Sequence, residues 1–141
     1  MATGTAPLLP PARSHVSEQV SYLRKKITYA VENTEIVIGT IPAYASVIGG
    51  GVHVLTAFND SGTDTLDIGF KDGSATDDPN ALATLLTIDA VGYIVLDELA
   101  ATTNILQTSE TIITCIYNGQ NNNASAGEAY VTIMYVTNYD T

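Results

Sequence analysis

The sequence has no tryptophan, two phenylalanines and a single cysteine, Cys115. One cysteine excludes an intramolecular disulfide. Cys115 lies in the apolar stretch TIITCIY (residues 111–117), so we expect a small buried side chain, with no neighbour in sequence that would activate its thiol. Binding clefts for ring-shaped ligands rely on aromatic side chains, so a sugar-stacking site would have to use the eight tyrosines. Glycan binding therefore stays open as an alternative.

Charge is scarce and uneven. Charged residues make up 14% of the chain, against about 25% in typical soluble domains. There are 15 acidic and 5 basic residues, and Arg13, Arg24, Lys25 and Lys26 all lie within the first 26 positions. The rest of the chain is strongly acidic, so it would repel phosphates and anionic lipids. We expect no nucleic-acid or membrane partner.

Long hydrophobic runs are also missing. The longest apolar stretch, residues 81–96, is interrupted by threonine, aspartate and glycine, and no apolar run follows a basic start. Neither a transmembrane helix nor a signal peptide is expected.

The chain lacks the motifs of metal sites and cofactor sites. His15, His53 and Cys115 have no zinc-ligand spacing, and His53 is expected to be structural. The acidic groups Asp60 with Asp64, and residues 72, 77 and 78, do not match the calcium-loop pattern and are expected to be solvated turns, with a weak cation site as the alternative. We predict no metal and no cofactor.

Catalytic motifs are missing as well. The glycines at 49–51 fit no phosphate-binding loop and predict a flexible loop, a bulge or a close backbone approach before a strand. No serine lies in a nucleophile elbow. Carboxylate pairs that meet only in space stay open. We predict that the chain is not an enzyme.

Alternation of apolar and polar residues dominates after residue 20, and turn-forming residues separate the alternating segments. This pattern predicts an all-β fold: an antiparallel β-sandwich or jelly roll of about eight strands. A short helix is also compatible with residues 80–86. Strands are expected near residues 27–31, 36–38, 52–58, 65–70, 93–96, 103–108, 111–117 and 129–136.

The N-terminal residues differ from the rest, which predicts an extended arm over 1–20 and a sandwich domain over 21–141. Three of the five prolines lie in the first 14 residues, and proline favours an extended path. A short helical turn over 14–22 is compatible with Ser14 as N-cap. The arm could add to a neighbour's sheet edge or lie in a groove, and a disordered tail is the alternative. The predicted partner-binding residues are Pro7, Leu8, Leu9, Pro10, Arg13, Arg24, Lys25 and Lys26.

Five stretches together resemble the small β-sandwich structural proteins of tailed bacteriophages, particularly capsid decoration (cement) proteins. They are GVHVLTAFN (51–59), TLDIG (65–69), GY (92–93), TIITCIY (111–117) and GEAYVTIMYV (127–136). The resemblance implies a homotrimer on the capsid surface, made in the host cytoplasm, whose arm reaches neighbouring subunits and whose body staples major capsid proteins together. The alternative is a tail or fibre component that binds a host glycan or another virion protein.

Overall fold

The computed structural model describes residues 20–71, 77–100 and 108–137. Eight strands and one short 3-10 helix, η3, make up the regular structure. In chain order they are β1 (Val20–Thr28), η3 (Tyr29–Val31), β2 (Glu35–Ile41), β3 (Ser46–Thr56), β4 (Thr65–Lys71), β5 (Asp78–Thr87), β6 (Gly92–Val95), β7 (Thr111–Asn118) and β8 (Glu128–Val136). No helix of the described part is long and apolar enough to cross a membrane.

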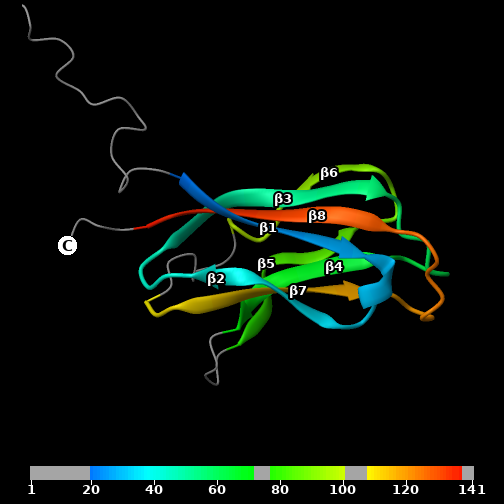
Figure 1. The fold of residues 1–141 in the computed structure, drawn as a ribbon, viewed down its shortest axis with the longest axis horizontal. Coiled ribbons are helices and arrows are strands. Elements are labelled where there is room, and N and C mark those ends of the chain that lie inside the picture. Colours follow the sequence, from blue (N-terminus) through cyan, green and yellow to red (C-terminus); the bar gives the residue numbers. More distant parts are fainter. Residues whose placement is uncertain (1–19, 72–76, 101–107, 138–141) are drawn as a thin grey trace, which may run out of the picture.

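The strands form two four-stranded antiparallel sheets, one over the other (Figure 1). The first sheet has the order β1-β8-β3-β6 and the second has the order β2-β7-β4-β5. The chain changes sheet at every step except from β4 to β5, and its first and last strands pair with each other. This connectivity is a jelly roll, which confirms the predicted fold class.

Alternate residues of each strand fill the core between the sheets. Ala129, Val131 and Ile133 of β8 are fully buried, and the residues between them reach solvent. The ring of Phe58, just beyond β3, meets the ring of Tyr117 on β7 edge to face, with centroids 4.7 Å apart, a favourable geometry for aromatic pairs. Packing between two inner faces, rather than a metal or disulfide, holds the sheets together in the described residues.

The predicted helix over residues 80–86 is wrong, because these residues belong to β5. This strand pairs with β4 at the edge of the second sheet, with two register shifts, and Leu85 has a positive φ of 52°. Asp67 accepts a hydrogen bond from the Leu85 backbone N–H at 2.6 Å, which fixes the irregular position. Pro79 is tolerated because β5 is an edge strand. Pairing with β4 therefore overrides the local helical preference.

The predicted strand over 27–31 is also misplaced. β1 ends at Thr28, and the chain turns through η3, where the backbone N–H of Tyr29 donates to the carbonyl of Gly127. The described end of the predicted 14–22 helical turn, from Val20 to Tyr22, is strand. Residues 14–19 of that turn, and residues 103–107 of the predicted weak strand, lie outside the described residues.

The glycines at 49–51 lie inside β3, so the predicted loop is wrong. A register shift between Val47 and Gly49 marks a bulge, and a Cβ on Gly50 would collide with the Thr132 carbonyl oxygen. The bulge and the close backbone approach are confirmed. Phe58, predicted to continue the strand of Val52 and Val54, lies beyond the end of β3.

Candidate interaction surface

The outer face of the first sheet carries large apolar and aromatic side chains that reach solvent. Because paired residues of neighbouring strands share a face, the register places them in rows. One row runs from Lys26 through Tyr130 and His53 to Tyr93, and the next runs from Arg24 through Thr132 and Gly51 to Val95. The exposed fractions of Tyr22, Tyr93 and Val95 are 66%, 59% and 63%. We call this surface the outer face.

Two glycines of β3 leave room on the outer face for side chains of the neighbouring strands. A Cβ on Gly51 would lie 2.6 Å from the phenol oxygen of Tyr93, and a Cβ on Gly49 would lie 2.9 Å from the terminal methyl of Met134. The side chains of Tyr93 and Met134 therefore lie over β3 at positions where a larger residue would push them away.

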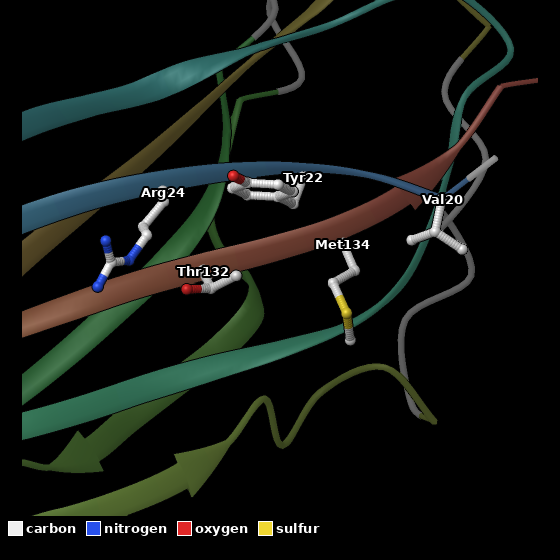
Figure 2. A pocket seen from close by; sticks show the side chains of 5 residues that line it. All are labelled: Val20, Tyr22, Arg24, Thr132 and Met134. Atoms are coloured by element: carbon white, nitrogen blue, oxygen red, sulfur yellow. The ribbon is translucent and has the colours of Figure 1, made fainter. Parts of the chain in front are cut away.

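A groove of about 460 Å³ lies on the outer face between β1 and β8. Figure 2 shows the side chains that line it, which project from these two neighbouring strands. The lining combines three apolar or aromatic side chains with a guanidinium and a threonine: Val20, Tyr22, Met134, Arg24 and Thr132. Such a lining suits an apolar side chain of a partner with a carboxylate or carbonyl beside it.

The basic residues of β1 differ in their partners. Arg24 lies over the Tyr130 ring, with its guanidinium carbon 3.8 Å from the ring centroid, a cation–π contact. Lys26 forms an ion pair with Glu128 at 3.3 Å. Among the described residues, Arg24 and Lys25 form no ion pair, which leaves their N–H donors for a partner. Lys25 occupies an inward position opposite Val131 but is exposed, because β1 is the edge of its sheet.

The carboxylate of Asp60 ties together the loops that follow β3 and β7. It accepts backbone N–H groups from Gln120, Asn121 and Asn123 at 2.5–3.0 Å. Desolvation raises the pKa of Asp60, whereas the backbone hydrogen bonds stabilise its charged form and lower the pKa. Together the hydrogen bonds outweigh desolvation, so the pKa lies below its ordinary value.

Asp64 is a second buried carboxylate at the same end, and it accepts a hydrogen bond from the Tyr117 hydroxyl at 2.5 Å. Burial raises the pKa of Tyr117, and the bond to Asp64 raises it further. Asp60 and Asp64 are 5% and 1% exposed, so the prediction of solvated turns is wrong for this pair. Both carboxylates serve loop structure.

The described residues contain no cluster of three or more side chains able to hold a metal ion. Residue 72 of the second acidic group lies outside them. Cys115 is buried, as predicted, and desolvation raises the pKa of its thiol to about 12, so it stays protonated at neutral pH. His53 is exposed in the middle of β3, on the outer face.

The structure brings together part of the predicted partner-binding set. Arg24, Lys25 and Lys26 lie side by side on β1. Pro7, Leu8, Leu9, Pro10 and Arg13 lie outside the described residues. The apolar side chains of the groove, Val20, Tyr22 and Met134, are not among the residues predicted from the sequence. One feature of the sequence could have indicated the groove. Val20 and Tyr22 alternate with Ser21 and Leu23, which places apolar residues on both faces of one strand.

No protein-family model matches the chain, and no curated protein matches it in sequence. Solved structures of phage capsids match its fold, among them the following three. A chain in the capsid of Ralstonia phage GP4 is 18% identical, with a TM-score of 0.62 over 94% of this chain and 92% of that one. A chain in the acidic stable capsid structure of Helicobacter pylori bacteriophage KHP30 is 16% identical, with a TM-score of 0.59 over 82% and 86%. A chain in the capsid asymmetric unit of cyanophage Pam1 is 14% identical, with a TM-score of 0.58 over 94% and 99%. The protein therefore has the sandwich fold of chains found in phage capsids.

Proposed function

We propose that the chain is a non-enzymatic structural protein of a phage particle: a decoration (cement) protein that binds major capsid proteins at the capsid surface. The observation that carries the proposal is the fold, shared with chains of phage capsids along most of their length. Within the described residues, the exposed apolar and basic side chains of β1 supply a contact surface for protein partners. The proposal includes synthesis in the host cytoplasm, a homotrimer, and no nucleic-acid or membrane partner.

The proposed mechanism uses two contacts. The proposed arm, which the structure limits to residues 1–19 because Val20 begins β1, extends the contact beyond the sandwich edges. Joining two contacts in one chain raises the effective concentration of the second. The arm continues directly into β1, whose first residue, Val20, lines the groove. Subunits held at two places separate less readily under internal pressure.

Deletion of residues 1–19 tests the arm, because it leaves β1 whole. We expect the shortened chain to lose binding to capsid shells assembled from the major capsid protein encoded with it, measured by co-sedimentation. A second variant replaces Leu8 and Leu9 with serine in the full chain. It keeps the length of the arm and should still bind more weakly, which separates the effect of the two leucines from that of arm length. Unchanged binding by the deletion variant would contradict the arm's role.

A tail or fibre component that binds a host glycan is the second candidate. The observation that favours it is the set of exposed tyrosines on the outer face, Tyr22 and Tyr93, because aromatic rings can stack on sugars. Binding of the isolated protein to a glycan array, lost on Tyr93→Ala, would support this candidate over capsid decoration.

A further inference from the structure

The two edge strands of the first sheet differ in charge: among the described residues, β1 is basic, whereas β6 is uncharged and lies between acidic segments. β1 forms one edge and holds Arg24, Lys25 and Lys26, three of the four basic residues in the described part of the chain. The fourth, Lys71, lies at the end of β4 in the other sheet and bonds Glu35 of β2. Beside the basic residues, Val20 and Tyr22 are 55% and 66% exposed.

The opposite edge strand, β6, carries no charged residue of its own and is even more apolar, with acidic residues in the segments on either side of it. Val91, Tyr93 and Val95 are 68%, 59% and 63% exposed. Asp89 precedes the strand and Glu98 follows it, and neither forms an ion pair with a described residue. Asp97 lies on the same side, where it accepts the Thr84 backbone N–H.

The charges at the two edges are complementary between unlike edges of two copies and repulsive between like edges. A contact between two β1 edges would bring guanidinium and ammonium groups together, and a contact between two β6 edges would bring carboxylates together, which costs affinity. A contact between β1 of one copy and β6 of the next pairs opposite charges around apolar side chains on both partners.

We propose that copies of this chain associate head to tail, with the β1 edge of one copy against the β6 edge of the next. The inference deepens the proposed function, on which its place in a particle rests, by naming the surfaces of self-association. A contact of this kind closes into a ring when the rotation between copies divides a full turn, as in a trimer. Lys25 points inward at the edge, a feature that blocks continuous β-sheet pairing, so the contact is made by side chains.

The test reverses the charges at each edge. Arg24→Glu with Lys25→Glu changes the β1 edge, and Asp89→Lys with Glu98→Lys changes the charge beside β6. Among the described residues, the only side-chain contact that these changes remove is the stack of Arg24 on Tyr130. Sedimentation velocity of the full chain should show self-association for the wild type and a loss of roughly tenfold or more for each edge variant. Circular dichroism checks that each variant is folded.

Mixing the two edge variants gives the decisive result. In the mixture, the β1 edge of each variant meets an opposite charge on the β6 side of the other, so the two variants should form mixed assemblies in which they alternate. An alternating closed ring needs an even number of copies, so a trimer should not form. All four changes in one chain should restore self-association. A wild-type chain that stays monomeric, or a mixture that does not associate, would overturn the proposal.

A control separates the edge from net charge. Lys25→Glu and Lys71→Glu change the net charge equally, and only Lys25→Glu should weaken association; equal weakening would overturn the proposed surface. Capsid-shell binding by wild type is measured in parallel. Self-association without shell binding contradicts the proposed capsid-binding role and not this inference. Shell binding without self-association contradicts this inference, together with the proposed homotrimer, and leaves the capsid-binding role standing.

Discussion

Single residues at one end of the sandwich hold its loops through buried carboxylates. Asp60 gathers three backbone N–H groups of the loop after β7, and Asn59 accepts two more, from Ser125 and Ala126. Such hydrogen bonds satisfy backbone groups that the loops would otherwise leave unpaired. Turn-forming acidic and amide residues therefore fix the ends of β3 and β8.

Tyr117→Phe should destabilise the protein by about 1–3 kcal/mol, because it leaves the Asp64 carboxylate buried without its hydrogen-bond donor. Urea unfolding followed by circular dichroism measures the change. The matched control is Tyr44→Phe, which removes a hydroxyl from a side chain that is 51% exposed and should change stability by less than about 0.5 kcal/mol. Equal effects of the two substitutions would contradict the role of the Asp64 bond.

The lowered pKa of Asp60 predicts a pH dependence of stability. A carboxyl whose folded-state pKa lies below its unfolded value stabilises the fold above the unfolded value, and the contribution is lost as pH falls through the folded pKa. The melting temperature of wild type should therefore exceed that of Asp60→Asn at neutral pH, and the gap should narrow as pH falls below the ordinary value of 3.8. Thermal scans across this range check it; a gap independent of pH would show that Asp60 does not act through its charge.

At the scale of elements, β3 pairs with β8 on one side and with β6 on the other, and its glycines allow both strands to approach closely. Gly50 has a φ of 135°, and Gly51 lies beneath Tyr93. A sequence pattern indicated that a bulge or close approach was possible here, but not that the segment is a central strand, because glycine disfavours strands locally. Pairing on both sides with β8 and β6 outweighs that preference.

Gly50→Ala should destabilise the protein by at least about 2 kcal/mol, since the added methyl meets both backbone strain and the Thr132 carbonyl. Gly92→Ala is the matched control, because Gly92 has a φ of 150° and no heavy atom within 4 Å of the added Cβ. It should cost about 1 kcal/mol, from strain alone. Denaturant unfolding compares them, and a Gly92 variant as unstable as the Gly50 variant would rule out the steric contribution.

β5 shows the same conflict between local preference and pairing. The stretch Ala81-Leu82-Ala83 favours a helix by composition, yet all three residues are buried in the core as part of an edge strand. The bond from Leu85 N–H to Asp67 and the bond from Thr84 N–H to Asp97 come from segments far along the chain. Such partners do not appear in a local pattern.

At the scale of the whole molecule, the jelly roll is complete within residues 20–136. Deletion of residues 1–19 should therefore leave the melting temperature within about 2 °C of wild type, because no described strand is lost. Deletion of residues 1–28 is the control: it removes β1, uncovers β8 and should prevent folding. A large loss of stability on the shorter deletion, seen in thermal scans, would show that the arm belongs to the folded body.

The sequence by itself determined the all-β class, the positions of the strongest strands and the split between basic N-terminal residues and an acidic remainder. These follow from side-chain alternation, turn residues and charge counts, which are local properties, and β7 and β8 match their predicted ranges closely. Only the tertiary structure decided the strand order, the edge position of β5, and the placement of Arg24 and Lys25 on one edge strand with the apolar β6 at the other edge of the sheet. The physical reason is that strand pairing joins residues that are distant in sequence. The register, and the surface that it creates, therefore cannot be predicted from any single segment.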